Sequence, residues 1–297
     1  MQKLPQLKSI LRQASLGATL LLSTACTSLL TDGVADKLAS QGQSVEEDLV
    51  LAREASAFYL KLSESVLRET PGNLKLAEAV AGGFTQYAYA FVAFEAERIE
   101  SRDAKAAEKL RERAARLYER AHRHAMAALE ANAPGFTAAL GKPDASQWPR
   151  LSQAQVGVAY WAAASWGGFI SLSKDNPEVV ADLPLAIRLA TLAYGVNPEH
   201  GNGALASLMG TFEAARPGGS VPQATAYFDR AIALGAGKSA GAFVAKAEGI
   251  AQVANDRVAF EALLRQALAA SAARRDLPNE VMRERAQWLL DTADDIF

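Results

Sequence analysis

Apolar positions along this chain recur at intervals of three and four residues, which is the spacing of one face of an α-helix. The series Ala55, Phe58, Leu62 and Val66 shows this spacing near the amino end. Three later series repeat it: Phe84, Tyr87, Phe91 and Phe94; Leu110, Ala114, Leu117, Ala121 and Ala125; and Met282, Ala286, Leu289, Ala293 and Ile296. Runs of β-branched residues with period two are essentially absent. The pattern therefore predicts helices without a sheet.

Proline and glycine fall between the periodic stretches, at places where a helix has to end. These breakers are Pro71-Gly72, Pro134-Gly135, Pro177, Pro198, Pro217-Gly218-Gly219 and Pro278. No Ser/Gly-rich or Pro-rich linker divides the chain after its first residues. We predict an all-α fold of about ten to twelve helices, mostly in antiparallel pairs, which form one domain over residues 32–297.

The stretch Ser152–Ser173 differs from the other predicted helices because it is apolar on two faces. A helix that is apolar nearly all round is buried. We therefore expect this helix at the centre of the fold, with Trp161 and Trp166 packed in the core or lining a cavity.

Small residues in two segments fit the second helix of a tetratricopeptide repeat, a helix pair of about 34 residues. These positions are Ala186, Ala190 and Ala193, followed by Pro198, and then Ala224, Phe228 and Ala231. Less regular units lie before and after them. We predict three or four degenerate repeats of this type, and an irregular helical bundle is the alternative.

The amino end carries the pattern of a secretory signal. Lys3, Lys8 and Arg12 precede an apolar run of about ten residues, which is too short to span a bilayer. The run ends at Ala25-Cys26 and resembles the lipobox of bacterial lipoproteins, in which the peptide is cleaved before a cysteine that becomes acylated. We predict a signal peptide over residues 1–25, lipidation of Cys26 and a short tether over residues 26–31. An ordinary signal peptide with a stray cysteine is the alternative.

The predicted lipid anchor implies a location outside the cytoplasm. Cys26 is the only cysteine, so the mature chain has no disulfide. Thr27 follows Cys26, where lipoproteins kept in the inner membrane often carry Asp. By this resemblance the protein faces the periplasm from the inner leaflet of the outer membrane.

Charge and motifs exclude several functions. The formal net charge is −2, so no basic field favours nucleic acid. The segment Gly201–Ala206 imitates a dinucleotide fingerprint, and Gly237-Lys238-Ser239 imitates the end of a phosphate loop, but neither follows a predicted strand. His122 and His124 are two residues apart, whereas zinc ligands on a helix are spaced by three or four. We predict no metal or cofactor site.

Two segments have both a structural and a functional interpretation. The segment from Arg102 to His124 is rich in charge, which fits a solvated helix face with pairs such as Glu112 and Arg116, or a docking surface for an acidic partner or lipid headgroups. The aromatic residues Trp161, Trp166 and Phe169 fit a packed core, or a ligand cavity or pore.

Several short sequence segments, taken together, resemble the T component of TRAP transporters, the TatT family of tetratricopeptide-like lipoproteins. They cover nearly the whole mature chain: Ala57–Leu62, Thr85–Val92, Tyr160–Gly167, Ala181–Pro184, Gly210–Phe212, Ala215–Gly219, Tyr227–Ala231 and Arg283–Leu290. The resemblance implies a periplasmic protein without catalytic activity that forms a homotrimer with a central pore. It would dock a solute-binding protein and help to pass a small ligand, for which an apolar organic acid is the suggested class.

The resemblance carries over only a few residues. Cys26 is the lipid site, and Trp161, Trp166 and Phe169 are candidates for the pore or cavity. Arg216 is a candidate for docking or for an anionic ligand, and Lys238 is a second one because it stands at a predicted helix start.

Two other functions stay open from the sequence. One is a generic scaffold lipoprotein for outer-membrane or cell-wall assembly. The other is a helical cell-wall hydrolase, which would need a glutamic acid whose pKa is raised by apolar surroundings. Glu213 and Glu248 lie on partly apolar helices and are the candidates for that role.

Overall fold

The computed structural model of the chain describes residues 35–39 and 48–297. Cys26, the predicted signal peptide and the tether lie outside the described residues. Every regular element in the described part is a helix, which confirms the predicted all-α class. The α-helices are α2 (Leu49–Glu69), α3 (Leu74–Ala88), α4 (Phe94–Ile99), α5 (Ala104–Asn132), α6 (Phe136–Leu140), α7 (Val156–Ser171), α8 (Pro177–Val180), α9 (Leu183–Val196), α10 (Ala204–Ala215), α11 (Val221–Leu234), α12 (Ala240–Lys246), α13 (Arg257–Ala273), α14 (Leu277–Asp291) and α15 (Ala293–Ile296).

Shorter turns of other helical types lie between these helices. Three are 3₁₀ turns: η2 (Ala145–Gln147), η3 (Gln153–Gln155) and η4 (His200–Gly203). Two are π-helical turns that widen the backbone: η1 (Tyr89–Ala93), between α3 and α4, and η5 (Ala247–Gln252), after α12. Such π turns often occur at functional sites.

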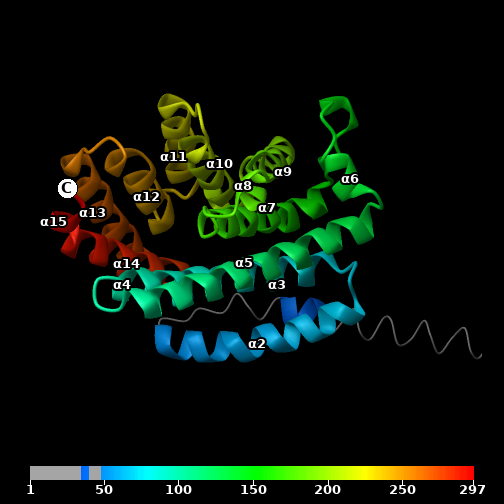
Figure 1. The fold of residues 1–297 in the computed structure, drawn as a ribbon, viewed down its shortest axis with the longest axis horizontal. Coiled ribbons are helices and arrows are strands. Elements are labelled where there is room, and N and C mark those ends of the chain that lie inside the picture. The colour runs from blue at the N-terminus through cyan, green and yellow to red at the C-terminus, as the bar shows by residue number, and fades with distance from the viewer. Residues whose placement is uncertain (1–34, 40–47) are drawn as a thin grey trace, which may run out of the picture.

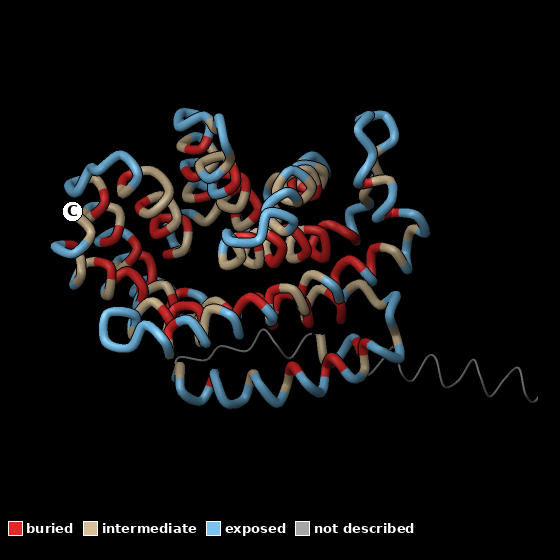
Figure 2. The backbone as a smooth tube through the Cα atoms, in the orientation of Figure 1, coloured by how far each residue is buried: buried red, intermediate tan, exposed pale blue. Residues whose placement is uncertain are grey.

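Helices α3, α5 and α7 pack on one another and form the centre of the molecule (Figure 1). Helix α2 covers α3 from outside, and α9 packs on α7. Figure 2 shows buried residues along α7 and along one side of α5. The prediction of a central, buried helix over residues 152–173 is thus confirmed, and α7 follows the short turn η3 within that range.

The predicted repeat positions lie at contacts between paired helices. Ala186, Ala190 and Ala193 of α9 are fully buried, and so are Ala224, Phe228 and Ala231 of α11, to within 1%. Helices α10 and α11 approach closely because Gly210 has no side chain. A Cβ atom there would lie 2.9 Å from Cδ1 and Cε1 of Phe228. Small residues therefore set the spacing within this pair, as the repeat pattern predicts.

The carboxyl-terminal helices form a second apolar core and return to the amino-terminal half. Helices α12, α13 and α14 pack around Phe260, Leu264 and Leu289. Trp288 of α14 then contacts Phe94 of α4 edge to face, with 5.5 Å between ring centroids. Helix α14 thus lies beside the π turn η1 and α4, far from it in sequence (Figure 1).

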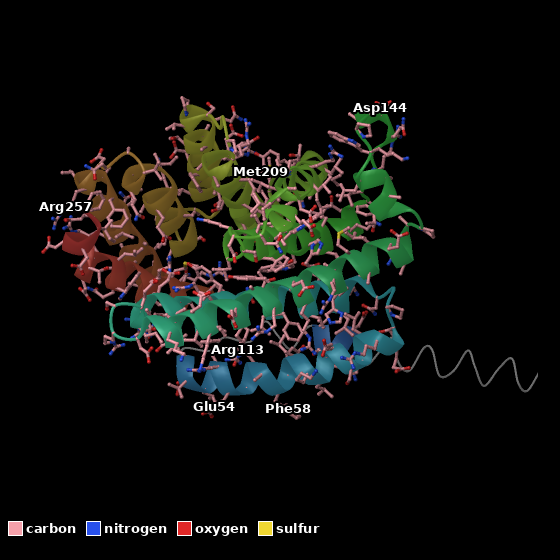
Figure 3. The ribbon with its side chains drawn as sticks, viewed as in Figure 1. Glu54, Phe58, Arg113, Asp144, Met209 and Arg257 are labelled. Carbon is pink, nitrogen blue, oxygen red and sulfur yellow. The ribbon has the colours of Figure 1, made fainter. Side chains whose placement is uncertain are left out.

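Helix α2 exists as predicted, but its apolar stripe faces outward. Phe58 is 75% exposed and Leu62 is 41% exposed. Figure 3 shows Phe58 at the edge of the molecule, directed away from the other helices. The buried face of α2 instead carries Leu60 and Leu67, together with the polar residue Glu64.

One segment in the described part, Pro177–Val196, is long and apolar enough to span a membrane, with a mean hydropathy of 1.5. It consists of α8 and α9, which a turn at Ala181-Asp182 separates. Leu189 and Ala190 of α9 are buried in the main core, so length and composition are weak grounds for a membrane span here.

Two glycine-to-alanine substitutions test the close packing of α10 and α11. We expect Gly210→Ala to lower the free energy of unfolding by about 1–3 kcal/mol, because Phe228 is fully buried and has no room to move. Gly195→Ala is the matched control, since a Cβ there meets no described atom within 4 Å. It should raise stability by up to about 1 kcal/mol through helix propensity. Urea unfolding measures both, and equal effects would contradict this account.

Candidate functional site

The three predicted aromatic residues lie on α7 but contact different neighbours. Trp161 packs on α3, where a Cβ atom on Gly82 would lie 2.7 Å from Cε2 of the indole. Trp166 is only 8% exposed, and its ring centroid lies 4.3 Å from that of His122 on α5. Phe169 is half-buried against the main core. The structure therefore brings Trp161 and Trp166 to two different helix contacts.

Three titratable side chains, Tyr160, His200 and Glu78, lie on or against α7. The Tyr160 ring lies 4.7 Å from Trp161 and 5.4 Å from His200. Burial raises the pKa of Tyr160 to about 12 and lowers the pKa of His200, so both side chains are neutral near pH 7. The Glu78 carboxylate lies against Gly157 at the start of α7, and burial raises its pKa as well.

The glycine-rich segment after His200 forms a turn, as the sequence indicates. Gly201, Asn202 and Gly203 all have positive φ angles, and Gly203 has φ = 99°. A Cβ on Gly203 would lie 2.5 Å from the carbonyl oxygen of Ala231. The glycine thus permits a close approach to α11, which explains it without a nucleotide.

The two histidines of α5 point to different neighbours. Nδ1 of His122 lies 3.2 Å from the carbonyl oxygen of Ala162 on α7. Nε2 of His124 lies 2.7 Å from the Glu64 carboxylate on α2. Within residues 35–39 and 48–297, no group of three His, Cys, Asp or Glu side chains is placed to hold a metal ion.

Glu64 is the centre of a charged cluster between α2 and α5. Its side chain is only 2% exposed and lies 2.7 Å from Nζ of Lys61, beside Arg120 and His124. Burial by itself raises the pKa of Glu64, but hydrogen bonds from Arg120, Lys61 and His124 outweigh it and hold the pKa far below its usual range. This carboxylate stays ionised and joins the two helices.

Arg285 forms a second buried cluster where the two ends of the helical array meet. Its guanidinium, 8% exposed, lies 2.6 Å from Glu248 of η5 and 3.0 Å from Glu97 of α4. It also lies 5.5 Å from the ring centroid of Tyr89 in η1 and 5.3 Å from that of Phe94. Both π-helical turns therefore contribute to the surroundings of one arginine.

Arg216, Glu213 and Glu248 are paired with other side chains, whereas Lys238 is exposed. Arg216 donates two hydrogen bonds of 2.8 Å to Glu213, and Lys238 lies in an exposed turn before α12. The hydrogen bond from Arg216 also lowers the pKa of Glu213. A general acid needs the opposite shift, so Glu213 does not fit that role. Glu248 is paired with Arg285.

A cleft of about 510 Å³ opens where α2, α4 and α14 meet, within the size range of small-molecule sites. Its apolar walls include Val50, Phe91, Phe94 and Val281. Its charged residues are Arg53, Glu54, Glu95, Arg98 and Glu284. In the described part Arg53 forms no ion pair, whereas Arg98 lies 3.9 Å from both Glu95 and Glu284.

The sequence did not predict this cleft. Phe91 and Phe94 belong to a periodic series that indicated only a helix face, and Arg53 is one charge among many on α2. The cleft exists because α14 returns to α2 and α4, and no local pattern reveals that contact.

The described residues form a helical repeat array around apolar cores, an architecture whose exposed helix faces suit contact with other proteins. The family model described as "TRAP transporter T-component" matches residues 45–297. The chain belongs to this family of TRAP transporter components.

Two similar proteins add context. An uncharacterized protein of Treponema pallidum (strain Nichols) is 26% identical over 262 residues, which are 85% of this chain and 81% of that protein. The crystal structure of a thermophilic TPR protein from Thermus thermophilus has a TM-score of 0.49 and 16% sequence identity, and the match covers 87% of this chain and 98% of that one.

The Glu64 cluster predicts how stability depends on pH. The folded-state pKa of Glu64 lies below the ordinary value of 4.5, so its contribution is present above that value and is lost as pH falls. We expect Glu64→Gln to lower the free energy of unfolding by about 3 kcal/mol near neutral pH, because Arg120 and Lys61 lose a buried partner.

Urea unfolding at about pH 7 and about pH 3 measures this difference. The difference in the free energy of unfolding between the variant and the natural protein should be smaller at about pH 3 than at about pH 7. A gap of equal size at both pH values would show that Glu64 is not ionised in the folded protein.

Proposed function

We propose that this protein is a lipid-anchored accessory of a TRAP-type uptake system, which docks the periplasmic solute-binding protein and holds or passes its small ligand. The single observation that carries the proposal is the family match over residues 45–297. The helical repeat architecture agrees with a role in contact with other proteins. Homotrimer formation, implied by the resemblance in the sequence, is part of the same proposal.

The proposed anchor is Cys26, acylated after cleavage of residues 1–25. More than one acyl chain gives a stable anchor where a single chain binds only marginally. The body of the protein would then face the periplasm from the inner leaflet of the outer membrane.

For the ligand we propose the cleft between α2, α4 and α14. Phe91 and Phe94 offer aromatic walls to an apolar group, and Arg53, which forms no ion pair within the described residues, offers its cation to a carboxylate. This assigns the anionic contact to Arg53 instead of Arg216, whose charge is matched by Glu213. Trp161, Trp166 and Phe169 remain proposed contacts for a path through an oligomer, and Lys238 a proposed docking contact.

Affinity capture from envelope extracts tests docking and anchoring together. The mature protein should retain a TRAP solute-binding protein under mild conditions. Cys26→Ser should move the protein out of the membrane fraction, or leave it uncleaved, while the capture persists. Recovery of cell-wall or outer-membrane assembly proteins alone would favour the scaffold function instead. A cleaved Cys26→Ser form that still fractionates with membranes would show that the anchor lies elsewhere.

Calorimetric titration with 4-phenylbutyrate, an aryl carboxylate, tests the cleft. Arg53→Ala should weaken binding about tenfold or more, because a charge-assisted hydrogen bond is lost. Arg216→Ala is the matched control and should change the affinity less than about twofold. The uncharged 4-phenylbutan-1-ol should bind more weakly than the acid. Equal loss in both variants, or equal binding of the alcohol, would refute the assignment to Arg53.

A further inference from the structure

The outward face of α2 carries an apolar stripe that nothing in the described part covers. The stripe consists of Leu51, Ala55, Phe58 and Leu62, hereafter the α2 stripe. Leu51 is 52% exposed and Phe58 75% exposed. In Figure 3 Phe58 and Glu54 lie at the outer edge of the molecule, with no described helix beyond them. A row of apolar side chains in this position indicates a contact with another molecule.

The spacing of the α2 stripe is that of a coiled-coil seam. Its residues follow one another at intervals of four, three and four. In a heptad labelled abcdefg, Ala55 and Leu62 then occupy position a, and Leu51 and Phe58 occupy position d. A seam of this kind is completed by a second helix that carries the same pattern, and every copy of this chain carries one.

Flanking charges indicate how the second helix runs. Glu54 and Lys61 precede the two a positions, so they occupy g positions. Both side chains are exposed, and Lys61, whose Nζ lies 2.7 Å from Glu64 of its own helix, keeps 59% of its side chain accessible for a second carboxylate. An antiparallel pair brings the g positions of the two helices together, so that Glu54 of each copy meets Lys61 of the other. A parallel pair would set g against e, where the residues are Tyr59 and Val66 and offer no charge.

The same register fits the apolar layers. With Glu54 opposite Lys61, Phe58 of one copy meets Ala55 of the other, and Leu51 meets Leu62. A large residue thus faces a small one in the inner layers, which lets the seam interdigitate. The arrangement has two-fold symmetry, so each contact occurs twice.

We infer that α2 pairs with α2 of a second copy of this chain, antiparallel, through the α2 stripe and two Glu54–Lys61 ion pairs. This inference does not rest on the proposed uptake function. It also differs from a threefold assembly, because a two-fold contact joins copies in pairs. If trimers form through another surface, the α2 contact joins two of them.

Analytical ultracentrifugation of the full processed lipoprotein in detergent tests the contact. Phe58→Asp should halve the protein mass of the assembly, from two copies to one, or from six to three. Val258→Asp on α13 is the matched control, because Val258 is 81% exposed and lies outside the stripe. It should leave the mass unchanged. An assembly whose mass is unaffected by Phe58→Asp, or a natural protein that is monomeric at every concentration, overturns the inference.

Charge exchange tests the antiparallel direction and does not depend on the folding of Phe58→Asp. Glu54→Lys places lysines opposite each other and should weaken the pairing about tenfold. Glu54→Gln removes the attraction without adding a repulsion, and it leaves the Lys61–Glu64 contact intact, so it should weaken the pairing less than Glu54→Lys does. Equal weakening by the two variants, or none by either, overturns the antiparallel register.

The same variants separate other occupants of the α2 stripe. Suppose that Phe58→Asp abolishes capture of the solute-binding protein while the mass of the assembly stays the same. The α2 stripe would then bind the solute-binding protein, and the inference would be overturned. Loss of binding to anionic lipid vesicles at unchanged mass would overturn it in favour of a membrane surface. If the two copies still pair but no solute-binding protein is captured, the inference about α2 stands and the proposed function fails.

Discussion

The buried guanidinium of Arg285 is the contact that fixes α14 against the amino-terminal half of the chain. The two largest apolar cores are separate clusters, one around α3, α5 and α7 and one around α12, α13 and α14, and a small third cluster lies between α10, α11 and α12. The packing of α10 and α11 on α12 connects the two large cores, and Arg285 adds a second connection, since its carboxylate partners Glu97 and Glu248 belong to different parts of the chain. A buried charge is costly unless it is well paired, so the position of α14 against α4 is strongly specified. The ends of the helical array are thereby held in one geometry.

The contact of α14 with α4 also creates the candidate ligand site. Phe94 lies under the Arg285 guanidinium, contacts Trp288 and lines the cleft. Loss of the ion pairs would therefore displace a wall of the cleft as well as the carboxyl-terminal helices. Tyr89 of the π turn η1 and Glu248 of the π turn η5 both contact this arginine. Stability and the proposed ligand binding thus depend on the same set of contacts.

Local periodicity was enough to predict the helices, but it did not show what each helix faces. The alanines of α9 and α11 were predicted correctly because close helix packing leaves room only for small residues. The pairs Glu112–Arg116 and Glu119–Arg123 follow from helical spacing and are present. The stripe on α2 has equally good periodicity, yet it faces solvent. The Arg285 cluster and the cleft were not predictable, because they join residues that only the closure of the array brings together.

Glu54 connects the two surfaces proposed for this protein. It lines the cleft between α2, α4 and α14, and it flanks the α2 stripe on the same helix. A carboxylate ligand beside Arg53 would change the field at Glu54, and the pairing with Lys61 of a second copy would do so as well. Two binding events that depend on one charged group are coupled, and their coupling is reciprocal. Ligand binding should therefore shift the association of α2 helices by the same factor by which association shifts ligand affinity.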